Sequence, residues 1–128
     1  MSLKESLRLM VVDDMSTSRA IITQCLDELG VSHYTTENSG RSAFSKLAAN
    51  PVHLVLSDYN MPDMDGLDLL KALRQNQSTQ RIGFILVTGK ATAEMVQAGQ
   101  QLGLNNLIKK PFTTETMQAC IERVVGPL

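Results

Sequence analysis

Polar side chains stand directly after four short apolar runs of this 128-residue sequence. The run LRLMVV is followed by two aspartates and HLVLS by a third, whereas FILVT ends in a threonine and NLIKK in a lysine. These residues are Asp13, Asp14, Asp58, Thr88 and Lys110. If the runs are parallel strands of one open sheet, their carboxyl ends form a single rim, where such sheets bind ligands. The pattern therefore predicts three carboxylates, a hydroxyl and an ammonium at one site.

Three carboxylates at one rim repel each other. Two unit charges about 4 Å apart interact by about 4 kcal/mol at an effective dielectric constant of about 20. One lysine offsets too little of this repulsion, whereas a divalent cation with oxygen ligands offsets it well. Because Mg²⁺ keeps bound water and accepts phosphate oxygens as ligands, the pattern favours a magnesium site. The alternative is that one of the aspartates stays protonated.

Phosphoryl transfer is the chemistry that suits these groups. Beside a magnesium ion and an ammonium, a carboxylate can attack a phosphoryl donor, because the cations neutralise charge on the transferring group. Asp58 is the predicted acceptor because it stands alone at its strand end, whereas the adjacent Asp13 and Asp14 suit the ion. Thr88 is predicted to hydrogen-bond a phosphate oxygen and Lys110 to pair with the phosphate.

Five apolar runs alternate with segments of helical spacing. The runs are too short for helices and predict strands at residues 7–12, 33–36, 54–56, 84–87 and 107–108. Apolar residues at helical spacing predict helices around residues 22–29, 43–47, 67–73, 95–102 and 117–124, the first ending at Gly30. Strands that alternate with helices imply right-handed crossovers. The predicted fold is a flavodoxin-like, doubly wound α/β fold with a five-stranded parallel sheet and five helices.

Length and composition predict one globular domain over residues 1–128, without an output domain. Hydrophobic residues make up 43% of the chain and charged residues 20%, which argues against disorder. The net charge of -1 argues against a broad positive field for nucleic acid or a membrane surface. No apolar run approaches the ~20 residues of a membrane span, and the N-terminal residues do not read as an export signal. We expect a cytoplasmic monomer.

The rim residues belong to four motifs, DDMSTSR at 13–19, SDYNMPDMDG at 57–66, VTGK at 87–90 and KPF at 110–112. Through these motifs the sequence resembles the receiver domains of response regulators over essentially the whole chain. The resemblance implies the same roles for the five rim residues, with the phosphoryl group on Asp58. It adds Asn60, whose backbone carbonyl is expected to bind the magnesium ion.

Within that family the chain resembles the chemotaxis regulators, which also stand alone. The resemblance implies a histidine kinase as the phosphodonor and a flagellar motor switch protein as the partner that receives the signal. It implies a signalling domain that catalyses its own phosphorylation and slow dephosphorylation, not an enzyme with a separate substrate. A stand-alone receiver that acts as a phosphate sink or as a phosphorelay intermediate remains an alternative.

Two positions depart from the chemotaxis members. Leu107, three residues before Lys110, stands where those members usually have an aromatic residue. Lys90, two residues after Thr88, stands where they often have an acidic one. Leu107 bears on how the site is coupled to partner binding, and Lys90 bears on phosphate lifetime or partner choice.

Two other classes use a similar sheet. Haloacid-dehalogenase-like phosphatases carry D-x-D-x-T after their first strand, whereas here Asp13 and Asp14 are adjacent and Met15 and Ser16 follow. Flavodoxins bind a phosphate after the first strand, where two carboxylates would repel it, and the aromatic content of 4% offers few rings for a flavin. The sequence argues against both classes.

Overall fold

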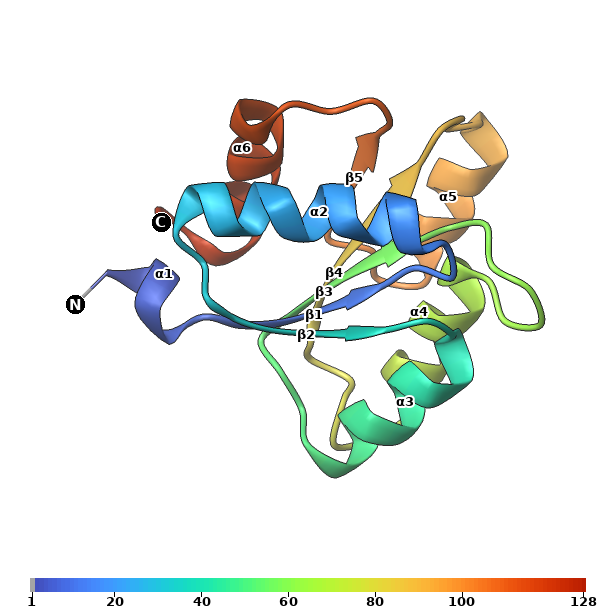
Figure 1. Ribbon diagram of the computed structural model, residues 1–128. Coiled ribbons are helices and arrows are strands. Elements are labelled where there is room, and N and C mark those ends of the chain that lie inside the picture. The colour runs from blue at the N-terminus through green and yellow to red at the C-terminus, as the bar shows by residue number, and fades with distance from the viewer. Residues whose placement is uncertain (1) are drawn as a thin grey trace.

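The computed structural model describes residues 2–128 and contains one sheet of five parallel strands (Figure 1). The strands are β1 (Arg8–Val12), β2 (His33–Glu37), β3 (Leu54–Asp58), β4 (Gly83–Thr88) and β5 (Asn106–Lys109). They lie in the order β2-β1-β3-β4-β5. All the strands predicted from apolar runs are confirmed, with bounds that differ by about two residues at most.

Six helices occur within residues 2–128: α1 (Leu3–Ser6), α2 (Ser16–Leu29), α3 (Gly40–Ala49), α4 (Gly66–Arg74), α5 (Ala93–Gln101) and α6 (Thr114–Val125). Helices α2 and α6 cover one face of the sheet, and α3 and α4 lie on the other (Figure 1). The five predicted helices are confirmed, and the prediction missed α1. A helix of 4 residues is too short to display apolar spacing.

The helix ends follow from local chemistry. Helix α2 ends at Gly30, as predicted, with the glycine in the left-handed region at φ 82°. At the start of α4, the Asp65 side chain accepts from the Asp68 backbone N–H while the Asp68 side chain accepts from that of Asp65. Thr113 and Thr116 form the same reciprocal arrangement at the start of α6. Each pair satisfies backbone donors that the first helical turn leaves free.

Two apolar clusters hold the helices against the sheet. One packs Ile22 of α2 and Ile121 of α6 against one face, and the other packs Leu47 of α3 and Leu70 of α4 against the opposite face. Strand β3 is buried along its whole length, as expected for a central parallel strand that is covered on both faces. Within residues 2–128, no helix is long and apolar enough to cross a membrane.

The strand order indicates where on the sheet a ligand can bind. From β1 the chain first passes to β2 on one side and then to β3 on the other, so the direction of winding reverses between β1 and β3. In open α/β sheets, ligands bind outside the carboxyl ends of the strands at this switch point. The register aligns Asp58 with Val87 and Thr88 with Lys109, which brings the ends of β3, β4 and β5 to the same rim.

Candidate functional site

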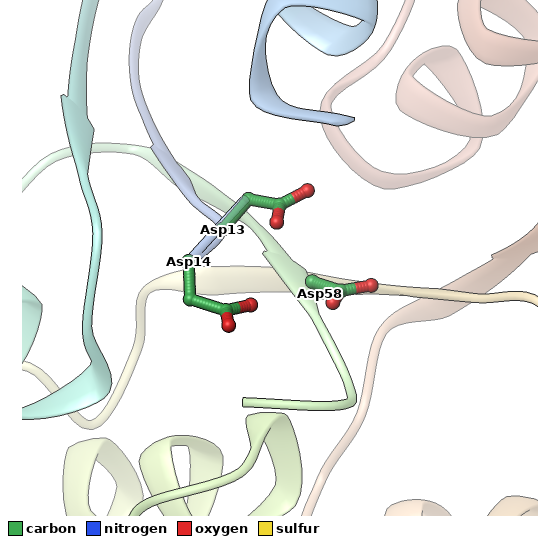
Figure 2. Close-up of side chains that lie close together, drawn as sticks. All are labelled: Asp13, Asp14 and Asp58. Carbon is green, nitrogen blue, oxygen red and sulfur yellow. The ribbon is translucent and has the colours of Figure 1, made fainter. Parts of the chain in front are cut away.

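Three aspartates meet at the switch point. Asp13 and Asp14 follow β1, and Asp58 is the last residue of β3 (Figure 2). Each offers a carboxylate oxygen, and these three oxygens lie within 4.8 Å of one another. Asp13 is fully buried and Asp58 is 6% exposed, so little water screens their charges. The predicted cluster of three carboxylates is therefore present in the structure.

The cluster fits a hard divalent cation. Asp13 Oδ1 accepts a hydrogen bond from the Met15 backbone N–H at 3.0 Å. Asp13 Oδ2 is buried and has no hydrogen-bond partner among the described residues. Leaving a buried carboxylate oxygen without a partner is costly, and Mg²⁺ prefers oxygen ligands of this kind. The donor set and the free oxygen therefore fit the predicted magnesium ion.

Lys110 brings an ammonium to the cluster. Lys110 Nζ lies 2.8 Å from Asp58 Oδ1, and the lysine side chain is 31% exposed. The Lys110 backbone N–H donates to the Thr88 carbonyl at 2.8 Å, which continues the β4–β5 pairing by one residue. The backbone of Lys110 is thus held by the sheet, and among the salt bridges of residues 2–128 no cation pairs with Asp13 or Asp14.

Burial raises the pKa of Asp58 above its ordinary value. The hydrogen bond and the charge of Lys110 act in the opposite direction, whereas the charges of Asp13 and Asp14 raise the pKa further. The net direction is upward, so one lysine does not offset the desolvation and the neighbouring carboxylates. A second cation at the site would favour the ionised, nucleophilic form of Asp58.

We expect ionised Asp58 to destabilise the fold when Mg²⁺ is absent. Because its pKa is raised in the folded state, acidification protonates Asp58 in the folded chain before the unfolded chain, which stabilises the fold. Asp58→Asn mimics the protonated form, so its free energy of unfolding should exceed that of the wild type at neutral pH. This excess should shrink as the pH falls through the raised pKa toward the ordinary value of 3.8. Urea unfolding of both proteins at several pH values measures this difference in the free energy of unfolding. A difference that is independent of pH would contradict the prediction.

Thr88 and Asn60 complete the predicted set. Thr88 is 5% exposed at the end of β4. Its Oγ1 accepts from the Lys90 backbone N–H and donates to the Lys90 carbonyl, both at 3.2 Å. The hydroxyl therefore has to leave the Lys90 carbonyl before it can donate to a phosphate. Asn60 lies in the loop after β3, two residues beyond Asp58, and its role as a backbone ligand of Mg²⁺ stays a prediction.

Two side chains on the first turn of α2 contact the site and were not predicted from the sequence. Arg19 Nη1 donates to the Asp13 carbonyl at 2.7 Å. Ser18 Oγ accepts from Lys110 Nζ at 3.0 Å. Both belong to the DDMSTSR motif. The sequence did offer one signal for Ser18 and Arg19. Both lie on the first helical turn after β1, and that turn has to pass the carboxyl end of the strand.

Known proteins resemble this chain over nearly its whole length. The response regulator receiver domain family matches residues 9–122. A Rhizobium etli protein named "Probable chemotaxis protein CheY" is 41% identical over 128 residues, which cover 100% of this chain and 99% of that protein. Chemotaxis protein CheY-3 of Vibrio cholerae is 31% identical over 122 residues, covering 95% of this chain and 94% of that protein.

A solved structure has the same fold. Chemotaxis protein CheY4 of Vibrio cholerae superimposes with a TM-score of 0.85 at 28% identity. The match covers 92% of this chain and 98% of that chain. The flavodoxin-like α/β fold predicted from the sequence is therefore confirmed.

Proposed function

Because the chain belongs to the response regulator receiver domain family, we propose that Asp58 accepts a phosphoryl group from a histidine kinase and that this modification changes partner binding. The observation that carries the proposal is the Asp58 carboxylate, buried at a strand end and paired with Lys110 at 2.8 Å. Two further carboxylates lie beside it, where they suit a metal ion. Receiver domains are signalling domains, not classical enzymes, and the proposed reaction modifies the protein itself.

In the proposed reaction, an oxygen of Asp58 attacks the phosphorus of the donor. The new O–P bond forms as the bond between phosphorus and the donor histidine nitrogen breaks, and the electron pair stays on that nitrogen. The product is an acyl phosphate on Asp58. Asp13, Asp14, Asp58 and the Asn60 backbone carbonyl would hold Mg²⁺, which supplies charge neutralisation for the transferring group.

Lys110 and Thr88 are proposed to contact the phosphoryl group. The Lys110 ammonium already lies against the acceptor carboxylate, so it can follow the oxygen that becomes esterified. The Thr88 hydroxyl can donate to a phosphoryl oxygen once it releases the Lys90 carbonyl. That exchange of hydrogen bonds would link the modification to the loop that leads into α5.

The names of the relatives support a role in chemotaxis. We propose a flagellar motor switch protein as the partner of the phosphorylated form, with both partners met in the cytoplasm. A phosphate sink or phosphorelay intermediate is the alternative within the family. Phosphotransfer profiling against the purified histidine kinases of the host, followed by a pull-down with the phosphorylated protein, separates the two roles. Capture of a motor switch protein supports the first, and return of the phosphoryl group to a kinase or a histidine phosphotransfer protein supports the second.

Lys90 is expected to lengthen the life of the phosphorylated state. Lys90 is an exposed cation in the loop that follows β4, and its backbone N–H donates to Thr88 Oγ1. Its ammonium can therefore pair with the phosphoryl group. An exposed pair of this kind is worth up to about 1 kcal/mol, so Lys90→Ala should lose phosphate about two- to five-fold faster. Lys71→Ala, which removes an exposed lysine on α4, serves as the control. Equal dephosphorylation rates for Lys90→Ala and wild type would leave Lys90 as a solvated or partner-contacting residue.

Leu107 is expected to repack passively when the protein is phosphorylated. Burial of a leucine contributes at most about 1.5–3 kcal/mol, whereas a change from 1:99 to 99:1 between two states requires about 5.5 kcal/mol. The loop from Thr88 to Lys90 and helix α5 should therefore carry most of the change. In NMR spectra, Leu107→Ala should keep the chemical-shift changes of α5 on phosphorylation. Loss of those changes while Asp58 is fully phosphorylated would make Leu107 the coupling residue.

A further inference from the structure

Lys110 has two acceptors on different parts of the fold. Its Nζ lies 2.8 Å from Asp58 Oδ1 at the end of β3 and 3.0 Å from Ser18 Oγ on the first turn of α2. Ser18 and Lys110 are 92 positions apart in the sequence. The lysine side chain is 31% exposed, so it is neither fully buried nor fully surrounded by solvent.

A second acceptor matters because lysine is a flexible ligand. Its ammonium is a point charge on a four-carbon stem with three rotatable donors, so one ion pair leaves its direction poorly defined. Two acceptors on separate elements define where the ammonium lies. A hydroxyl is also neutral, so it orients the lysine without competing with Asp58 for its charge.

The first turn of α2, which carries Ser18, is itself held in place. The next residue, Arg19, donates from Nη1 to the Asp13 carbonyl at 2.7 Å and ties the first turn of α2 to the end of β1. Further along the helix, Ile22 is fully buried in the core. The helical turn that carries Ser18 is therefore anchored beside the end of β1.

We propose that Ser18 is a positioning residue for phosphoryl transfer, acting through Lys110. This inference rests on the proposed function of Asp58. When an Asp58 oxygen becomes esterified, the carboxylate loses its negative charge and attracts Lys110 less strongly. The hydrogen bond between Lys110 and Ser18 does not depend on that charge. Ser18 thus keeps the ammonium beside the phosphoryl group through the transfer. Among the hydrogen bonds and ion pairs of residues 2–128, no side chain of α2 contacts the Asp58 carboxylate. Helix α2 would therefore contribute to the chemistry only through Lys110.

The rate of phosphorylation by acetyl phosphate tests this role. At saturating Mg²⁺, Ser18→Ala should phosphorylate about three- to ten-fold more slowly, as expected for the loss of a partly exposed hydrogen bond to a charged group. Its affinity for Mg²⁺ and its thermal unfolding should match those of the wild type, because alanine suits a helix and Ser18 is not a proposed metal ligand. Thr17→Ala, which removes the neighbouring exposed hydroxyl, is the matched control and should react at the wild-type rate.

Two further variants separate positioning from packing. Ser18→Thr keeps the hydroxyl and should restore most of the rate, whereas a loss that persists in this variant would assign the effect to packing and overturn the proposal. In a Lys110→Ala background, Ser18→Ala should cause no additional loss. If the Lys110→Ala background reacts too slowly, the affinity for beryllofluoride, a phosphoryl mimic, is compared instead. The four proteins compared are the wild type, Ser18→Ala, Lys110→Ala and the double variant. An equal loss with and without Lys110 would overturn the proposal.

The outcomes are distinguishable from failure of the proposed function. If wild type is phosphorylated and Asp58→Asn is not, the function of Asp58 stands whatever Ser18 does. A wild-type rate for Ser18→Ala then overturns the positioning role alone. If Asp58→Asn is phosphorylated like the wild type, the proposed function fails and the positioning role fails with it.

Discussion

Asp58→Asn is expected to abolish phosphorylation by acetyl phosphate in the presence of Mg²⁺. The amide of asparagine has nearly the shape of the carboxylate but cannot act as the nucleophile that forms an acyl phosphate. The variant should still fold, because asparagine resembles the protonated form of a side chain whose pKa burial already raises. Gels that retard phosphorylated proteins measure the loss directly.

Asp63→Asn is the matched control for this variant. Asp63 belongs to the same SDYNMPDMDG motif, but its side chain is 80% exposed and lies 3.9 Å from Arg41, outside the carboxylate cluster. Asparagine also tolerates its positive φ of 69°. The control should be phosphorylated at the wild-type rate. Labelling of Asp58→Asn at that rate would place the acceptor elsewhere, with Asp14 as the next candidate.

The second large effect is expected at Asp13, where one substitution should have opposite consequences with and without Mg²⁺. Asp13→Asn keeps an oxygen for the Met15 N–H but replaces a carboxylate by a neutral amide. Its affinity for Mg²⁺ should fall by about ten-fold or more, because a charged ligand is lost. Asp14→Ala should also weaken Mg²⁺ binding. Calorimetric titration with Mg²⁺ measures both variants, and an unchanged affinity would contradict the proposed ligand set.

Without Mg²⁺, Asp13→Asn should be more stable than the wild type. The carboxylate oxygens lie within 4.8 Å of one another, where two unit charges repel by at least about 3.5 kcal/mol at an effective dielectric constant of about 20. Lys110 and water offset part of this, so we expect a gain of about 1 kcal/mol in the free energy of unfolding. Added Mg²⁺ should then stabilise the wild type more than the variant. Asp63→Asn should show neither effect, and a variant less stable than the wild type without Mg²⁺ would contradict the account.

Much of the site could be predicted from the sequence because its residues adjoin strands that are easy to recognise. Asp58 and Thr88 end β3 and β4, which are buried almost throughout and therefore appear as continuous apolar runs. Parallel strands share one carboxyl end, so adjacency in the sequence was enough to gather the five rim residues. Strand β2 was harder to predict, because none of its residues is fully buried and its pattern is weak.

Contacts between distant segments could not be predicted, because no local pattern encodes them. Lys110 is recognisable as a residue at a strand end, but nothing near it in the sequence indicates Ser18, 92 positions away. The guanidinium of Arg74 at the end of α4 is a second example. It donates to the carbonyls of Gln80, Ile82 and Gly103 and to the side chain of Asn105. These bonds tie α4 to the turn that follows α5, and helical spacing predicts only that Arg74 lies near a helix end.

Chemical mapping of the phosphorylated residue tests the central claim most directly. Borohydride reduces an acyl phosphate of aspartate to homoserine, so treatment of the phosphorylated protein marks the acceptor for peptide mass spectrometry. We predict homoserine at position 58 when donor and Mg²⁺ are both present, and none when Mg²⁺ is chelated. Homoserine at position 13 or 14, or an unmodified Asp58 in protein that carries the phosphoryl group, would contradict it.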